Sequence, residues 1–588
     1  MAEYVTGYKT NLRTTITANF KLAQELDMIT KGLKFTGLFS FKNYSSSSTE
    51  RSASYNHYYM SSYDPSSMEY KITRIGDEQS TALTNDGSRN GDRKIYFQAI
   101  LDYNRIFKEV HDLNIMFLYN QEQYDINGPT TLFSSLPQRK QGVAGRVSYS
   151  YDGRYYIEGN FGYNGSENFA KGHRFGFFPS IAVGYNISNE KFWQPIKPVI
   201  SNLKIRGSWG LVGNDATNAG RFAYMEDLVL GGSDSYTTGI RQDTYYSGPS
   251  WNRYFNPDLT WEVGEKINLG LDLQLFNDFN LTFDIFREKR RDIFMTRENS
   301  IPEIVGTGET KITSNNGEME NKGLDLAIDY NKQITKDFFL SFKSTLTFAR
   351  NKVLKMDESP YFEYPGLSDV GHPLGTYWGY VADGLFPDQE TIDNSPRQDL
   401  GYTPQPGDIK YVNQPNAKGE YDNVINSNDR VAIGHPYDPE LVYGFGPSMK
   451  WKNWDFSFFF QGVARTSFMM YGMHPFGTTS IKNMLQFVAD DHWSVDNPNP
   501  NAAYPRLTKD SNGNNDQYST YWLRNAAFLK LKNAEIGYTY KGMRFYLSGV
   551  NLLTFSPFKH WDPEMGGGNG LYYPTQRVFN IGFQMTIQ

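Results

Sequence analysis

Apolar and polar residues alternate with a period of two along most of this chain. Within residues 268–275, four leucines alternate with polar residues or glycine, which is the pattern of a β-strand with one apolar face. After Asn277-Asp278 the alternation resumes over residues 281–285, so the two segments predict a hairpin with a short turn. The same pattern predicts long strands in further segments: 12–18, 95–103, 113–119, 324–330, 340–348, 456–460, 545–551 and 579–587.

The connections between these segments alternate between short and long. Short turns are predicted at 151–154 and 332–336, and long loops at 213–259, 353–439 and 468–521. Short turns on one rim and long loops on the other are the plan of an outer-membrane barrel, whereas separate soluble sandwiches would have strands of about five residues. We therefore predict an all-β chain in which residues 1–588 form one antiparallel transmembrane β-barrel domain of about 17–19 strands.

The alternation also predicts which side chains face lipid. Every backbone group at membrane depth must be paired within the protein, so the sheet must close and turn its apolar face outward. Leu271 and Leu273 are then expected to face lipid, and Asp272 and Gln274 the lumen. Aromatic residues at strand ends would form the interfacial girdles, and the alternative is that they pack a soluble β core. The girdle candidates are Trp451, Trp454, Tyr538 and Tyr540.

Composition narrows the class of protein. The 588 residues include 42 Tyr, 41 Phe and 53 Gly, as expected for many strands separated by turns. Cysteine is absent, which excludes disulfides, thiolate metal sites and a cysteine nucleophile. The 58 basic and 64 acidic residues give a net charge of −6, without the basic surface that nucleic acid requires. No apolar run reaches the roughly 18 residues of a spanning helix, and we expect no secretory signal at the start, so a membrane role requires a β-barrel.

Four sets of acidic residues are candidate sites of chemistry. Residues 490–493, Asp-Asp-His-Trp, suggest a metal ligand cluster, but a solvated turn is the more common role in a long polar loop. Asp438-Pro439-Glu440 and Asp562-Pro563-Glu564 could supply an acid and a base, yet Asp-Pro favours a turn where a loop meets a strand. An oxygen-rich set in one loop lacks the regular spacing of an EF-hand, which leaves a bound calcium only weakly supported: Asp408, Asp422, Asn426, Asn428 and Asp429.

Two glycine-rich segments were considered as nucleotide or phosphate sites. Gly306-Thr307-Gly308 lacks the third glycine of a dinucleotide fingerprint, and residues 566–570 lack a following helix. We therefore predict that the chain is not an enzyme and that it has no catalytic, cofactor-binding or metal-binding residues. No pattern in the sequence marks its substrate-binding residues.

A series of short motifs, in order along nearly the whole chain, resembles the SusC/RagA family of TonB-dependent outer-membrane transporters from Bacteroidetes. Each motif alone is weakly specific, and the ordered set is strong. The motifs are residues 101–105 (LDYNR), 174–180 (RFGFFPS), 203–210 (LKIRGSWG), 256–262 (NPDLTWE), 316–323 (NGEMENKG), 380–386 (YVADGLF), 406–411 (PGDIKY), 529–533 (LKLKN) and 549–554 (GVNLLT).

The resemblance implies a fold and a function. Such proteins are similar in having a barrel of about 22 strands that is filled by an N-terminal plug. The resemblance further implies import of oligosaccharides or peptides, a SusD-like surface lipoprotein as partner, and energy from a TonB complex that contacts a segment ahead of the plug. The alternative is an outer-membrane adhesin or structural surface barrel without transport.

The sequence also departs from the family pattern. No signal peptide, TonB-contacting segment or plug precedes the first predicted strand, so we expect a barrel that is incomplete at its N-terminus, either a fragment or one part of a split transporter. Residues 412–419 replace the acidic, calcium-like run that is usual in the family, which further weakens a metal hypothesis.

Overall fold

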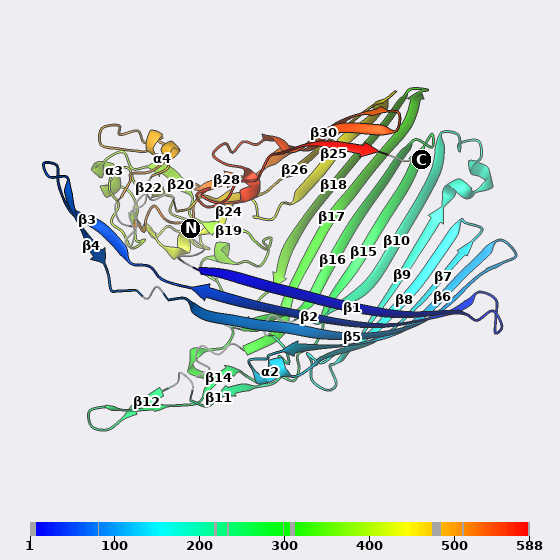
Figure 1. Ribbon diagram of the computed structural model, residues 1–588, viewed down its shortest axis with the longest axis horizontal. Helices are drawn as coiled ribbons and strands as arrows, with labels where there is room; N and C mark the ends of the chain where they lie inside the picture. The colour runs from blue at the N-terminus through cyan, green and yellow to red at the C-terminus, as the bar shows by residue number, and fades with distance from the viewer. Residues whose placement is uncertain are drawn as a thin grey trace.

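The computed structural model describes residues 7–79, 82–216, 220–231, 235–297, 299–305, 312–472, 484–508 and 511–585. Its main feature is a 17-stranded sheet in which strands adjacent along the wall are antiparallel and follow one another in chain order. The sheet curls into a barrel-shaped wall with β1 (Gly7–Glu25) and β31 (Val578–Met585) as its two edges (Figure 1). This confirms the predicted all-β, antiparallel barrel fold.

The other strands of the wall are β2 (Leu33–Ser52), β5 (Thr84–Phe107), β6 (His111–Asn127), β7 (Gln138–Tyr151), β8 (Tyr155–Ser166), β9 (Phe175–Asn186), β10 (Ile200–Asn214), β15 (Glu262–Leu275), β16 (Phe279–Arg297), β17 (Ile312–Thr335), β18 (Phe338–Lys355), β25 (Leu441–Trp451), β26 (Trp454–Ala464), β29 (Phe528–Tyr540) and β30 (Met543–Phe555).

Short turns and long connections alternate along most of the wall, as predicted. The exception is β9, where the connection at the short-turn end (187–199) is longer than the one at the opposite end (167–174). The short turns gather at one end and the long connections at the other (Figure 1). The turn between β15 and β16 lies at the predicted place, and Phe276 and Asn277 adopt positive φ there. The turn expected at 332–336 lies later, at 336–337, because residues 331–333 still pair with β18.

Several strands extend well beyond their predicted bounds. The pattern predicted a strand over 95–103, whereas β5 begins at Thr84 and pairs with β2 from Thr84 to Tyr103. Residues 84–94 are polar or glycine throughout, so no alternation marks them. Backbone pairing alone continues the sheet at the long-connection end, where both faces of the ribbon are polar and period two is lost.

The long connections contain small strands and short helices. Of the helices in the described ranges, none is long and apolar enough to cross a membrane. The elements are β3 (His57–Asp64), β4 (Glu69–Ile75), α2 (Leu132–Ser135), η1 (Ile187–Asn189), η2 (Lys191–Trp193), β11 (Asp227–Val229), β12 (Ser235–Thr238), β13 (Thr244–Ser247), β14 (Ser250–Arg253), η3 (Glu303–Val305), η4 (Pro365–Leu367), β19 (Tyr377–Gly379), β20 (Ala382–Leu385), α3 (Gln389–Asp393), β21 (Arg397–Gln398), β22 (Ile409–Tyr411), β23 (Val424–Ile425), η5 (Ser427–Asp429), β24 (Val431–Ile433), β27 (Ser467–Met469), α4 (Gln486–Asp490), β28 (Leu523–Asn525) and η6 (Pro563–Met565).

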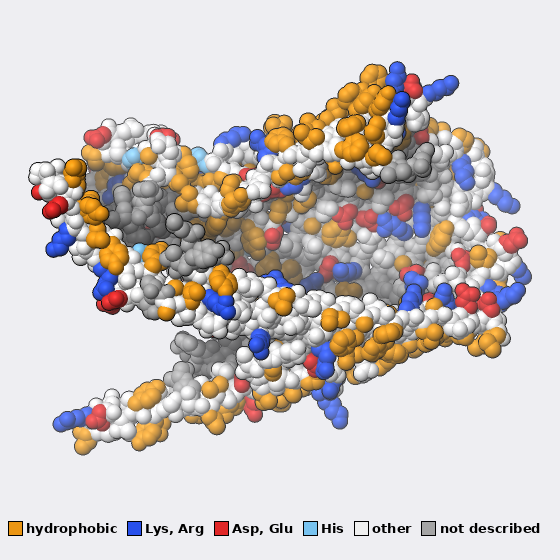
Figure 2. All heavy atoms as spheres, in the orientation of Figure 1, with side chains coloured by type: hydrophobic (Ala, Val, Ile, Leu, Met, Phe, Trp, Pro, Cys, Tyr) orange, Lys and Arg blue, Asp and Glu red, His pale blue; other side chains and the backbone are white. Residues whose placement is uncertain are grey.

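The wall carries charged side chains on one face and apolar side chains on the other. Arg206 of β10 lies between two carboxylates, with its Nε 3.2 Å from Asp272 and its Nη2 2.7 Å from Asp284. On the opposite face, Leu269 is 57% exposed although it sits in the middle of a strand. Figure 2 shows charged side chains on the inside of the hollow and hydrophobic ones across the outer surface. Exposed apolar strand faces of this extent are suited to lipid contact.

The predicted assignment of faces is confirmed by the register. Asp272 pairs with Lys204 on one side and Thr282 on the other, so it belongs to the polar face. Leu271 lies on the other face, in a row with Ile205 and Phe283. Since side chains alternate along a strand, Leu273 shares the face of Leu271, and Gln274 that of Asp272.

The predicted girdle residues meet at the short-turn rim. Trp451 and Trp454 flank the two-residue turn between β25 and β26, and both rings are exposed. The ring of Trp454 lies 4.8 Å from that of Tyr538 on the neighbouring strand. Tyr540 ends the same strand, next to the following turn. Exposed Trp and Tyr at strand ends are typical of a membrane interface.

Replacing Leu271 by arginine should destabilise the wall by about 2–4 kcal/mol, because a charge would face lipid near the bilayer midplane. Asp272→Asn is the matched control on the adjacent position. It removes one partner of Arg206, which keeps Asp284, so its effect should stay below about 1 kcal/mol. Urea unfolding of the two variants in lipid vesicles measures the difference. Equal losses for the two variants would contradict the assignment of faces.

The most tightly packed apolar core lies in the long connections and not in the sheet. We call the described residues of connections 356–440, 465–527 and 556–577 the loop cap, which stands at the long-connection end of the wall (Figure 1). These three connections share one buried core. Its members include Tyr380, Leu385, Ile409, Tyr411, Phe468, Met470, Trp493, Tyr504, Trp522 and Phe558.

Candidate functional site

A tight turn in the Pro-Gly-Asp-Ile-Lys-Tyr motif (406–411) lies at the centre of the loop cap. The Asp408 carboxylate accepts a hydrogen bond from the Gln405 amide at 2.8 Å, and the Asp408 amide donates to the Gln405 carbonyl at 3.0 Å. Gly407 has a φ of +87°, and a Cβ there would come within 2.2 Å of the Trp493 ring. Glycine is therefore required by both the backbone conformation and the packing.

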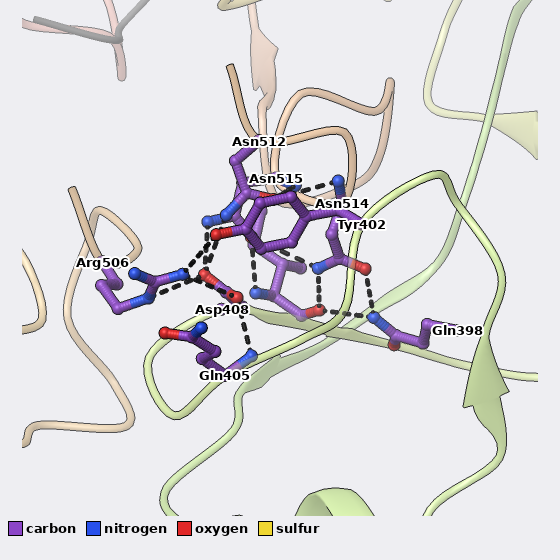
Figure 3. Close-up of polar contacts among 9 residues, drawn as sticks. Gln398, Tyr402, Gln405, Asp408, Arg506, Asn512, Asn514 and Asn515 are labelled. Carbon is purple, nitrogen blue, oxygen red and sulfur yellow. Dashed lines mark hydrogen bonds and ion pairs between the residues drawn. The ribbon is translucent and has the colours of Figure 1, made fainter. Parts of the chain in front are cut away.

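The Asp408 carboxylate is fully buried and is bound from the second cap connection (Figure 3). Arg506 donates to its two oxygens at 3.2 Å each. Asn512 and Asn515 donate to Oδ1 at 3.1 and 2.9 Å. Although burial lowers the pKa of Arg506, its hydrogen bonds to Asp408 and Tyr402 raise it above the ordinary value, so the ion pair stays charged.

Neighbouring amides extend this network to the backbone of β22. Asn514 and Gln398 adjoin the Asp408 network (Figure 3). Asn514 donates to the Ile409 carbonyl at 2.8 Å, and Gln398 accepts from the Tyr411 amide at 2.7 Å. Burial raises the pKa of the Tyr411 phenol, which stays neutral and donates to the Asn514 carbonyl at 2.7 Å. The motif thus joins two connections that lie about a hundred residues apart, and its role is structural.

The oxygen-rich set considered for calcium is divided among separate structural roles. Asp429 accepts from the backbone amides of Gln414 and Asn426 at 2.7 and 2.8 Å, and burial raises its pKa. The Asn426 side chain caps η5 by accepting from the Asn428 amide, and Asp422 accepts from the Val424 amide. Within the described ranges, no group of three or more potential metal-ligating His, Asp or Glu side chains is found.

Asp562-Pro563-Glu564 begins the short helix η6 inside connection 556–577, whereas Asp438-Pro439-Glu440 forms a bend directly before β25. Carboxylates of both segments bind cations. Lys530 is completely buried, and its ammonium lies 2.6 Å from Asp562 and 2.5 Å from Glu564. In the other segment, Glu440 lies 3.2 Å from Arg350 and 2.6 Å from Arg465. These carboxylates fix the ends of cap connections to the wall, and they are not placed as an acid and base pair.

The Lys530 contacts make the attachment of connection 556–577 pH-dependent. Burial raises the pKa values of Asp562 and Glu564, but hydrogen bonds from Lys530 outweigh it and hold both below their ordinary values. A carboxyl group whose pKa is lowered in the folded state stabilises that state fully when the pH is above its unfolded-state pKa of about 4–5. This stabilisation of the folded connection is lost as the pH falls through the lowered pKa. Limited proteolysis over this range should therefore show cleavage in 556–577 increasing towards low pH. Cleavage that is constant with pH would contradict this.

Four tyrosines from the three cap connections line two adjoining cavities, which we call the tyrosine cleft. A cavity of about 410 Å³ is lined by Tyr377, Tyr471, Tyr518 and Tyr572, together with Met and Gly residues. A second cavity, of about 300 Å³, shares Tyr471 and Tyr518 and extends towards Tyr504. The cleft thus exists only where connections 356–440, 465–527 and 556–577 meet.

The tyrosine side chains are positioned by backbone contacts between the connections. The Tyr471 amide donates to the Gly568 carbonyl at 3.1 Å, and the Tyr518 carbonyl accepts from the Tyr380 amide at 2.9 Å. A Cβ at position 379 would lie 2.4 Å from the Tyr518 carbonyl oxygen, so Gly379 permits this approach. The neighbouring Tyr572 side chain raises the pKa of Tyr471.

The remaining candidates from the sequence have structural roles or lie outside the described residues. His492 contacts the Ala489 carbonyl at 2.8 Å, while Trp493 is buried in the cap. Residues 566–570 form an irregular turn with positive φ at Gly566, Gly568 and Gly570. Residues 306–308 lie outside the described ranges. The tyrosine cleft was not predicted, because its members are scattered through loops that have no period.

A family model described as "TonB dependent receptor-like, beta-barrel" matches residues 3–552. TonB-dependent receptor P3 of Formosa agariphila is 27% identical over 478 residues, which cover 75% of this chain and 45% of the relative. TonB-dependent receptor SusC of Bacteroides thetaiotaomicron is 29% identical over 468 residues, covering 75% of this chain and 43% of SusC. The chain therefore spans somewhat under half the length of these curated relatives.

Solved structures show the same fold. The RagAB peptide transporter superposes with a TM-score of 0.72 at 19% identity, covering 98% of this chain and 62% of the other. The RagAB peptide importer in its "open-open" state gives a TM-score of 0.74 over the same coverage. The resemblance to SusC and RagA that the motifs indicated is confirmed. The chain belongs to the TonB-dependent receptor-like β-barrel family and is an outer-membrane protein.

Proposed function

We propose that this chain forms part of the barrel wall and the loop cap of a TonB-dependent importer, which takes up oligosaccharides or peptides. The main support for this proposal is the structure of the wall. The wall has an apolar outer surface, a charged inner face and a packed cap at one end. Such a wall provides a polar path through a membrane. The carboxylates considered for catalysis are bound by lysine and arginine, which favours transport over an enzymatic role.

The wall requires further strands in order to close. Within the described residues, β1 pairs only with β2 and β31 only with β30. Unpaired backbone groups at membrane depth are not tolerated, so we infer that both edges pair with strands contributed by additional polypeptide. The barrel domain that spans residues 1–588 in our interpretation would then be one part of the complete wall.

The proposed partners follow from the relatives. SusC and RagA indicate a SusD-like surface lipoprotein at the outer mouth, and the family indicates a TonB complex acting through a segment N-terminal to a barrel. The solved relatives are named as peptide transporters or importers, which supports peptides as one substrate class. The alternative function is a surface adhesin on the same barrel, and the two functions make different predictions for uptake.

Deletion of the gene, with and without a functional TonB, tests the proposal. Cells are grown separately on mixed oligosaccharides and on mixed peptides as sole nutrient. Loss of growth on one class, matched by loss of TonB and restored by complementation, is the expected result. Unchanged growth on both classes, combined with reduced attachment to surfaces, would favour the adhesin and overturn import.

A further inference from the structure

We propose that the tyrosine cleft is a binding subsite for a neutral oligosaccharide. This inference rests on the proposed import function and adds to it a place and a chemical class. It is based on three features of the cleft: exposed aromatic faces, a 410 Å³ cavity without a charged side chain among its described lining residues, and a rigid backbone frame that joins three connections.

The exposed aromatic surface is the first feature. Tyr471, Tyr518 and Tyr572 are 51%, 47% and 58% exposed, although they lie beside the most tightly packed part of the molecule. Tyrosine combines a flat apolar face with a hydroxyl, so one side chain can contact the apolar side of a ring and hydrogen-bond to its substituents. Sugar rings present both kinds of surface.

The second feature is the charge of the side chains that line the cleft, which distinguishes a neutral oligosaccharide from a peptide as the ligand. The 410 Å³ cavity is lined by Tyr, Met and Gly, without a charged side chain among its described lining residues. In the 300 Å³ cavity, Arg506 is bound to Asp408, whereas Asp516 is an exposed carboxylate that accepts from Ser511 at 3.0 Å, so the part of the cleft without charge is the 410 Å³ cavity. A peptide carries charged termini and often charged side chains, which would lose solvation in the 410 Å³ cavity without gaining a counter-charge. A neutral oligosaccharide has no charged group to desolvate, so its binding avoids this cost in free energy.

Rigidity is the third feature. Tyr471 and Tyr518 sit on backbone that is hydrogen-bonded to Gly568 and Tyr380, each on a different connection. The backbone positions of these aromatic residues are therefore fixed before a ligand arrives, which lowers the entropy lost on binding. Because the two cavities share Tyr471 and Tyr518, a linear ligand can occupy both in succession.

The test uses the native protein purified from outer membranes in detergent. Binding is measured by calorimetry against short neutral oligosaccharides of glucose, mannose, xylose and fructose, and against a panel of mixed-charge peptides. Among the neutral oligosaccharides, at least one is expected to bind. The double variant Tyr471→Ala/Tyr518→Ala should weaken that binding by about tenfold or more, since it removes two stacking faces. Tyr518→Phe keeps the ring and should lose much less.

Tyr245→Ala is the matched control, because Tyr245 is 63% exposed on β13, which lies in a different connection, and it should leave binding unchanged. Three results would overturn the subsite: no neutral oligosaccharide binds, binding is unaffected by the double variant, or only peptides bind and lose affinity with it. TonB-dependent uptake by cells carrying each variant is measured in parallel. Unchanged uptake by the double variant would contradict the proposed subsite but not the proposed import function. Absence of uptake by the wild type would contradict the import function itself.

Discussion

Replacing Asp408 by alanine is expected to destabilise the loop cap by about 3–5 kcal/mol while the wall remains folded. The carboxylate is fully buried, and its removal leaves the Arg506 guanidinium without its counter-ion. The side-chain amides of Asn512 and Asn515 would lose their acceptor in the same step. Buried donors without partners are costly because no water replaces the lost contact.

Hydrogen–deuterium exchange measures the stability of the cap and that of the wall separately in this experiment. Faster exchange is expected in 398–411 and in 511–525, with unchanged protection in β15 and β16. Asp399→Ala is the matched control, since Asp399 is exposed and its contact with Arg397 lies at the surface. Its effect should stay below about 1 kcal/mol. Similar exchange in both variants would show that the Asp408 network does not hold the cap together.

Replacing Lys530 by methionine is expected to release connection 556–577 from the wall, at a cost of about 3–5 kcal/mol. Lys530 is completely buried, and methionine fills a similar volume without the charge. The two carboxylates of Asp562 and Glu564 would then face each other without the shared cation. Limited proteolysis at neutral pH should reveal new cleavage within the connection.

A triple variant and a neighbouring lysine make this test specific. Adding Asp562→Asn and Glu564→Gln to Lys530→Met removes the unpaired charges and should restore much of the protection. Lys532 also contacts Glu564, at 3.0 Å, but its side chain is partly exposed. Lys532→Met should therefore have an effect below about 1 kcal/mol. Equal sensitivity of the two single variants would contradict the role assigned to Lys530.

The membrane part of the wall was predictable because lipid contact imposes a pattern on the sequence. The alternation around Leu271 and Asp272 gave the correct strand, turn and faces. Beyond the membrane this constraint disappears, which explains why the polar extension of β5 over residues 84–94 was missed. Backbone pairing continues there without any requirement on side-chain polarity.

The loop cap could be predicted only in part. Local backbone preference indicated a change of chain direction at Asp562-Pro563, where Asp562 caps the short helix η6. The partners of Asp408 were not, because Arg506 and Asn515 lie about a hundred positions further along the chain. The tyrosine cleft depends in the same way on three separate connections, and each contributes one or two aromatic residues that have no distinctive spacing.

The position of the tightest core has a consequence for how the protein is made. The cap connections join neighbouring strand pairs of the wall, so their core forms only after β18, β25, β26, β29 and β30 are side by side. Long connections of an outer-membrane barrel end up outside the cell, whereas the short turns stay on the periplasmic side. The cap segments therefore pack against one another only after the strands that carry them have paired. We therefore expect the loop cap to fold last, after the wall has been inserted into the membrane.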